Sequence, residues 1–193
     1  MSMIDMLQQR LGGEAVKQIS ARLGTDPGTT QSAIAAALPM LVGALARNAQ
    51  DPGKAGALSN ALSRDHDGSV LDDVAGYLNR NDDADGDGIL GHVLGGKQQS
   101  VQTGLGQVAG IDPGKAGMLL SMLAPLVMGA LGKAQRDGKL DPGGLAGMLG
   151  GEQQRAADAA PGVMGMLGKF LDRDGDGSVM DDIGGLLGKT FGR

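Results

Sequence analysis

The chain has 193 residues, a length that suffices for one compact domain or two small ones with a buried core. It has no cysteine, which excludes disulfides, thiolate metal ligands and cysteine nucleophiles. Its one tyrosine and two phenylalanines exclude the stacking platforms used in sugar and nucleic-acid binding. The formal net charge is −5, and the acidic residues are unevenly distributed: 13 of the 22 are aspartates in two short regions, 65–87 and 172–182.

The composition also predicts the fold class. Gly, Ala, Leu and Met are abundant, whereas β-branched residues are sparse and no stretch has the sustained two-residue alternation of a half-buried strand. Small residues and flexible thioethers let helices approach each other closely. We therefore expect an all-α protein.

The N-terminal residues and the basic side chains indicate location and partners. Residues 1–13 do not have the basic start and unbroken apolar run of a secretory signal, since Asp5 interrupts them. We expect a cytoplasmic protein, with non-standard export to the periplasm or the outside as the alternative. Lys and Arg are scattered singly, so nucleic acid is not an expected partner.

Four Asp-Pro-Gly sequences divide the chain, and each predicts the start of a helix. An Asp before a helix accepts hydrogen bonds from the first backbone N–H groups, and Pro at the first helical position loses no bond. Apolar helices are expected after the first and third copies, over roughly 29–49 and 115–134. The four copies begin at Asp26, Asp51, Asp112 and Asp141.

The two halves of the chain repeat each other, which predicts an internally duplicated helical bundle. Residues 39–45 match 125–131 at an offset of 86, and residues 67–73 match 176–182 at an offset of 109. The growing offset indicates insertions in the second copy. The expected repeats are 1–96, with two acidic segments, and 97–193, with one.

The two apolar helices allow two interpretations. Their uncharged runs are shorter than the roughly 20 residues of a membrane span, and each has a proline in its middle. We interpret them as kinked core helices wrapped by amphipathic ones. The alternative is a calcium-modulated, membrane-active or pore-forming protein that uses the helices at 34–46 and 116–132 on an anionic membrane.

Three acidic segments predict calcium sites. Ca²⁺ takes six to eight oxygen ligands, and alternating carboxylates at positions 1, 3 and 5, Gly at 6 and a backbone carbonyl at 7 supply them. The candidate ligands of the first segment are Asp65, Asp67, Ser69, Asp72 and Asp73; of the second, Asp83, Asp85, Asp87 and Ile89; of the third, Asp172, Asp174, Asp176, Ser178, Asp181 and Asp182.

The three segments resemble EF-hand and dockerin-type loops in their openings and depart from them elsewhere. The third has all three early carboxylates, but Ile183 stands where position 12 should supply a bidentate Glu. The first has Ser63 at position 1. The second has no carboxylate after Asp87. Each could instead be an acidic turn without a metal.

The predicted function follows from these segments. We expect Ca²⁺ to be the cofactor of a protein without catalytic activity, in which the metal orders helix packing or self-association into a homo-oligomer. No phosphate-binding Gly-x-x-x-x-Gly-Lys loop, His-Glu-x-x-His zinc site or Gly-x-Ser-x-Gly elbow occurs.

A family resemblance rests on the order of the motifs. Asp-Pro-Gly, an apolar helix with Pro-x-x-x-Gly-Ala-Leu, and Asp-Gly-Ser-Val-x-Asp-Asp-Ile/Val follow one another in both halves. This order resembles the YidB-like bacterial proteins. The resemblance implies a small helical bacterial protein and supplies no catalytic residue.

Overall fold

The computed structural model describes residues 2–80, 83–159 and 165, and within these ranges it contains helices and no β-strand. The predicted all-α fold class is confirmed. The elements are α1 (Met3–Arg10), α2 (Glu14–Leu23), α3 (Pro27–Ala49), α4 (Pro52–Asp65), η1 (Ser69–Leu71), α5 (Val74–Asn79), α6 (Asp83–Leu94), η2 (Gly95–Lys97), α7 (Gln98–Ala109), α8 (Pro113–Gly138) and α9 (Pro142–Ala159).

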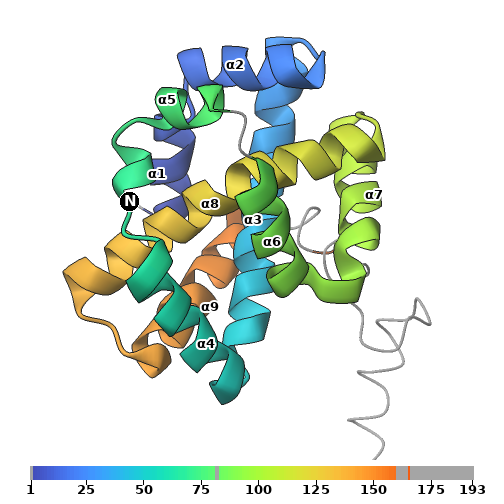
Figure 1. The fold of residues 1–193 in the computed structure, drawn as a ribbon. Coiled ribbons are helices and arrows are strands. Elements are labelled where there is room, and N and C mark those ends of the chain that lie inside the picture. Colours follow the sequence, from blue (N-terminus) through green and yellow to red (C-terminus); the bar gives the residue numbers. More distant parts are fainter. Residues whose placement is uncertain (1, 81–82, 160–164, 166–193) are drawn as a thin grey trace, which may run out of the picture.

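The long helices α3 and α8 form the centre of the fold, where they pack against each other (Figure 1). Leu38 and Leu41 of α3 are buried, as are Leu119 and Leu123 of α8. The shorter helices surround this pair, so the hydrophobic core follows the two apolar helices predicted from the sequence. Burial of their apolar side chains is the main stabilising contribution to such a fold.

The Asp-Pro-Gly sequences start helices as predicted. Asp26 Oδ1 accepts a hydrogen bond from the Thr29 N–H at 2.9 Å, at the start of α3. Asp112 Oδ1 accepts one from the Gly114 N–H at 2.7 Å, at the start of α8. The two remaining copies cap α4 and α9 in the same way, through Asp51 and Asp141.

A proline lies in the middle of each long helix, and both helices continue through it. Because proline has no N–H, the carbonyl four residues earlier loses its helical donor. For Pro125 of α8 that carbonyl belongs to Ser121. A Cβ on Gly86 of α6 would lie 2.0 Å from this oxygen, so only glycine lets α6 pass so close to α8.

Elements of the two sequence repeats occupy corresponding places. Gly24 and Gly110 are 86 residues apart, and each ends a helix in the left-handed conformation, with φ of 60° and 67°. The central helices α3 and α8 follow them. Next, α4 packs on α8 and α9 packs on α3, so each repeat places a helix on the other's central helix. The predicted boundary between residues 96 and 97 falls in η2.

Candidate functional site

The first acidic segment, residues 65–73, connects α4 to α5 at the surface, as predicted for a loop between helices. Asp67 Oδ1 accepts a hydrogen bond from the Ser69 N–H at 2.9 Å. Asp73 Oδ1 accepts one from the Gly76 N–H at 2.8 Å, at the start of α5. Both carboxylates therefore cap the backbone. The side chain and the N–H of Ser69 together lower the pKa of Asp67 below its ordinary value.

The other two carboxylates of this segment lie apart from that arrangement. Asp65 is the last residue of α4, and its Oδ2 pairs with Arg64 Nη2 at 3.4 Å with both side chains exposed. An exposed ion pair of this kind contributes little to stability. Asp72 is exposed at the end of η1. The segment is thus a capped turn whose acidic side chains do not converge on one point.

The first acidic segment lies directly on α8. A Cβ on Gly132 would be 1.7 Å from the His66 carbonyl oxygen, and one on Gly129 would be 2.4 Å from Val70 Cγ1. The Arg136 guanidinium donates to the Asp67 carbonyl oxygen. The contact therefore depends on two glycines of α8, which leave room for the turn.

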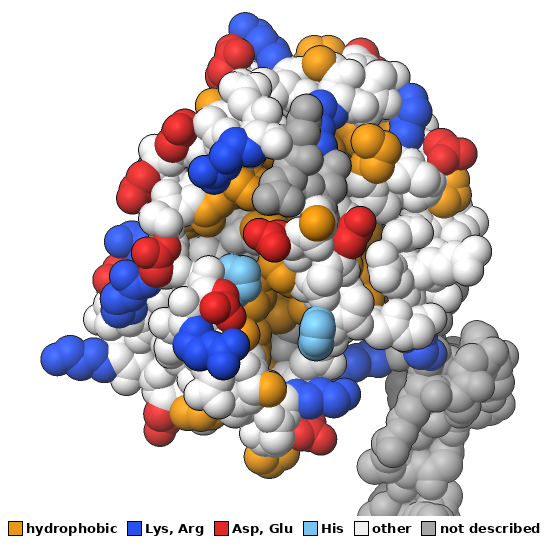
Figure 2. All heavy atoms as spheres, viewed as in Figure 1, with side chains coloured by type: hydrophobic (Ala, Val, Ile, Leu, Met, Phe, Trp, Pro, Cys, Tyr) orange, Lys and Arg blue, Asp and Glu red, His pale blue; other side chains and the backbone are white. Residues whose placement is uncertain are grey.

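His66 follows the last residue of α4 and belongs to the first acidic segment. Burial lowers the pKa of its imidazole below the ordinary value, while the carboxylates of Asp65 and Asp85 act in the opposite direction. The two histidines of the chain and several acidic side chains border a hollow with hydrophobic side chains at its floor (Figure 2). His66 is therefore partly withdrawn from solvent.

The second acidic segment is not a loop, and this prediction was wrong. Asp83, Asp85, Asp87 and Ile89 all belong to helix α6. The physical reason is packing: Gly86, Leu90 and Leu94 recur at the helical spacing and are all buried. Tertiary contact with α8 thus overrides the low helix propensity of the glycines in this segment.

The glycine and aspartate of α6 have structural roles in place of the predicted calcium turn. Gly86 allows the close approach to α8, and Asp87 accepts a hydrogen bond from the buried hydroxyl of Ser121. The exposed His92 shares a hydrogen bond between its Nδ1 and the Gly88 carbonyl oxygen, at 2.8 Å. These contacts are typical of a packed helix.

Within residues 2–80, 83–159 and 165, no group of three or more His, Asp or Glu side chains is placed to hold a metal ion. The first two segments therefore contain no preformed site in this part of the chain. The third segment lies outside the described residues, with its candidate ligands Asp172, Asp174, Asp176, Ser178, Asp181 and Asp182. Calcium binding there stays a prediction.

A groove between α1, α3 and α9 was not predicted from the sequence. Its volume is about 610 Å³, and its lining includes Ile4, Ala35, Pro39 and Ala156. Asp5 and Arg155 add opposite charges to the same lining. The groove forms only when the first and last described helices meet on α3, so no local sequence motif announces it.

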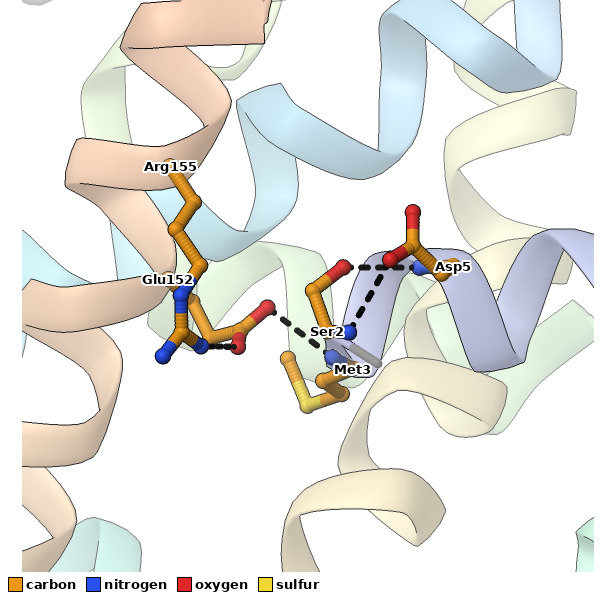
Figure 3. Close-up of polar contacts among 5 residues, drawn as sticks. All are labelled: Ser2, Met3, Asp5, Glu152 and Arg155. Atoms are coloured by element: carbon orange, nitrogen blue, oxygen red, sulfur yellow. Dashed lines mark hydrogen bonds and ion pairs between the residues drawn. The ribbon is translucent and has the colours of Figure 1, made fainter.

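Buried Glu152 holds α1 against α9 beside this groove (Figure 3). One of its carboxylate oxygens accepts a hydrogen bond from the Met3 N–H at 3.0 Å, and the other accepts one from Arg155 Nη1 at 2.7 Å. Ser2 and Asp5 form a capping box at the start of α1. Two hydrogen bonds from Ser2 lower the pKa of Asp5.

The helices α3 and α8 are long and apolar enough to cross a membrane, judged by length and composition alone. In the fold, however, 78% of the apolar stretch of α3 and 83% of that of α8 are buried. The interpretation as core helices therefore agrees with their packing, and core helices of soluble proteins pass the same test.

These features define an all-α bundle built on two repeated central helices, with an acidic turn seated on one of them. The chain belongs to the DUF937 family, described as bacterial proteins of unknown function, whose family model matches residues 5–134. The resemblance to YidB-like bacterial proteins is consistent with this match. Neither the curated proteins nor the solved structures contain a match. The matched range ends within α8, before the third acidic segment.

Proposed function

We propose that this protein is a calcium-binding helical protein without catalytic activity, and that its cation site is the third acidic segment, residues 172–182. The proposal is supported by the repeat partner of that segment. Residues 65–73 form a surface turn that joins two helices and packs on the central helix α8. That is the setting in which a bound Ca²⁺ fixes the angle between helices.

The third segment has the ligands that the first one lacks. Asp172 stands at the first loop position, where the first segment has Ser63, and Asp174 and Asp176 follow at alternating positions. Three carboxylates around one point repel each other, and a divalent cation removes that repulsion. Asp181 and Asp182 are the candidates to complete the shell.

The described part of the chain explains why the first segment is the weaker candidate. The carboxylates of Asp67 and Asp73 already accept backbone hydrogen bonds, and Asp65 and Asp72 do not converge with them. A cation there would have to compete with these caps. The first segment therefore serves as the metal-free counterpart of the third.

The proposed role of the cation is to order helix packing or self-association. In the described repeat, the turn and α5 lie on helices α8 and α2, so a change in the turn reaches the packed core directly. Cation binding at the third segment would act on the corresponding contacts of the second repeat. A homo-oligomer that forms only with Ca²⁺ is one consequence to examine.

Calorimetric titration of the full chain after chelator treatment tests the proposal. We expect about one Ca²⁺ per chain, with a dissociation constant in the micromolar to millimolar range of flexible oxygen loops. Asp174→Asn should weaken binding at least about tenfold, because a position-3 carboxylate is lost. The matched control is Asp65→Asn, the corresponding residue of the first segment, which should leave the titration unchanged.

Two results would contradict the proposal. One is the absence of any binding heat, together with an unchanged circular dichroism spectrum, over this concentration range. The other is equal weakening by Asp65→Asn and Asp174→Asn, which would place the cation elsewhere.

The membrane-active alternative has one observation in its favour, the length and hydropathy of α3 and α8. It requires both helices to leave the core and expose leucines that are now buried. Leakage of a dye from vesicles rich in anionic lipid, with and without Ca²⁺, distinguishes the two proposals. A calcium-binding protein with a permanent core leaves the vesicles intact in both conditions.

A further inference from the structure

The contact between the first acidic segment and α8 has a defined set of residues. On α8 they are Gly129, Gly132, Lys133 and Arg136, spaced so that all lie on one side of the helix. Gly68 adopts a left-handed φ of 88°, and a Cβ there would be 2.9 Å from Lys133 Cβ. The segment is therefore held at backbone distance along about two turns of α8.

The same face exists on α3. At the offset of 86 residues that relates the central helices, the corresponding residues are Gly43, Ala46, Arg47 and Gln50. Gly43 is identical to Gly129, whereas Gly132 is replaced by the buried Ala46. Because a Cβ at position 132 would lie 1.7 Å from the His66 carbonyl oxygen, a segment on α3 must lie farther from the helix at Ala46 than the first segment lies from α8 at Gly132. Arg47 and Gln50 are exposed, as Lys133 and Arg136 are on α8.

The segment that lies on α8 also has a second copy. Residues 65–80, which form the end of α4, the turn and α5, match residues 174–189 at an offset of 109. Both copies contain Asp-Gly-Ser-Val followed by Asp-Asp, and Val74 and Leu78, which are buried in α5, correspond to Ile183 and Leu187. The segment that packs on α8 and the helix face that it contacts are thus both duplicated in the sequence.

The next element of the described copy adds a second contact. Helix α5 packs on α2, where Arg22 Nη1 donates to the Leu78 carbonyl oxygen at 3.3 Å. The counterpart of α2 is α7, which ends at Gly110 as α2 ends at Gly24 and packs beside α3. A segment docked on the α3 face would therefore contact α7 through the residues that correspond to α5.

We propose that residues 176–189 dock within the same chain on the α3 face made by Gly43, Ala46 and Arg47, and continue onto α7. The described chain leads toward this face, because Ala159 at the end of α9 lines the same groove as Ala35 and Pro39 of α3. The sixteen residues that follow, up to residue 175, can span about 50 Å when extended, more than the length of α9.

The docking is independent of the calcium proposal. The first segment contacts α8 through the His66 carbonyl at Gly132 and the Val70 side chain at Gly129. It also accepts a hydrogen bond from Arg136 at the Asp67 carbonyl oxygen. None of these contacts uses a carboxylate oxygen. The copy on α3 can form with or without a cation. Failure of calcium binding would therefore leave this inference untouched.

Paramagnetic relaxation in the full chain tests the docking. The chain has no cysteine, so Arg47→Cys and Lys133→Cys each place a single nitroxide label at an exposed position of α3 or α8. The label at position 133 should broaden the amide signals of Gly68, which lies beside it, and of Val70, which lies beside Gly129 one turn earlier. The label at position 47 should broaden those of Gly177 and Val179 to a similar extent, in chelator, in Ca²⁺ or in both.

Two outcomes would overturn the proposal. The first is the absence of broadening at residues 176–180 in both conditions from the label at position 47, or stronger broadening there from the label at 133. The second is broadening that appears between labelled ¹⁴N chains and unlabelled ¹⁵N chains when these are mixed, which would place the segment on a second copy. A disulfide between Arg47→Cys and Gly177→Cys, the counterparts of Lys133 and Gly68, that forms within one chain would support the docking by an independent readout.

Discussion

At the scale of single residues, Glu152 is a carboxylate within an apolar stripe. Leu145, Leu149 and Ala156 occupy the same buried side of α9, and the Glu152 side chain is only 4% exposed. A buried carboxylate is costly to desolvate unless its oxygens are hydrogen-bonded. Both oxygens are bonded here, so the residue fixes where the N-terminal helix attaches.

Replacing Glu152 should therefore destabilise the fold. We expect Glu152→Leu to lower the free energy of unfolding by about 1–3 kcal/mol, because the Met3 N–H loses its acceptor. Glu152→Gln keeps an acceptor oxygen and should cost less. Urea unfolding followed by circular dichroism measures both variants. As a control, Glu14→Leu removes an exposed ion pair with Lys17 and should change the stability little. Equal losses of unfolding free energy in Glu152→Leu and Glu152→Gln would contradict the role of the Met3 bond.

His66 gives the fold a specific dependence on pH. Because its pKa is lowered in the folded state, the unfolded chain binds the proton more readily. Its contribution to stability is full above the unfolded pKa of about 6.5 and decreases below it. The decrease levels off once the pH is below the lowered pKa of the folded state.

A neutral substitution should remove this dependence. Melting temperatures of the native chain and of His66→Gln, measured from about pH 7.5 to about pH 5, should converge as the pH falls. His92→Gln is the control, because it removes the other histidine of the chain, which is exposed on α6. Parallel profiles for the native chain and His66→Gln would show that the partly buried ring does not cause the dependence.

At the scale of elements, α6 shows how a local pattern can mislead. Alternating aspartates and glycines at 83–88 favour a turn when considered alone. Within the fold the same residues are helical, because Leu90 and Leu94 bury one side of α6 and Gly86 lies against the Ser121 carbonyl. A contact between residues far apart in the chain decides the structure here.

Two glycines of α6 that are two residues apart test this explanation. Gly86→Ala should destabilise the protein, because the added methyl would lie 2.0 Å from the Ser121 oxygen. In contrast, Gly88→Ala meets nothing within 4 Å and should stabilise it by about 0.5–1 kcal/mol through helix propensity. Thermal unfolding measures both. A loss of stability in Gly88→Ala would indicate that the segment needs glycine for a turn and is not helical.

The four helices that follow Asp-Pro-Gly could be predicted, and the reason is local. The Asp-Pro-Gly starts form caps through bonds that span only two or three residues, so sequence alone determines them. The turn at 65–73 was also predicted as a link between helices. What could not be predicted is where carboxylates point, since Asp67 and Asp73 bond to backbone groups and do not gather around a common centre.

At the scale of the whole molecule, the repeats share one core. Because α4 packs on α8 and α9 packs on α3, neither repeat buries its central helix with its own elements alone. A single hydrophobic cluster includes buried side chains of both repeats, from Met3 in α1 to Ala156 in α9. Duplication in the sequence therefore produced interlocked halves, which the repeat pattern by itself did not reveal.

Interlocked repeats should unfold together. Tyr77 in α5 is the single tyrosine of a chain without tryptophan, so its fluorescence reports on the first repeat, whereas circular dichroism reports on all helices. We expect both signals to give the same urea midpoint, as in a two-state transition. Separate midpoints would mean that the repeats are stable independently of each other.

The bond between Glu152 and the Met3 N–H has a further consequence for exchange with solvent. Amides in the first turn of a helix have no partner within that helix and normally exchange their protons quickly. Capping side chains bind some of them within two or three residues, but the acceptor of the Met3 amide is a buried carboxylate 149 residues away in the chain. The exchange rate of this one proton therefore reports how often the two described ends of the bundle separate.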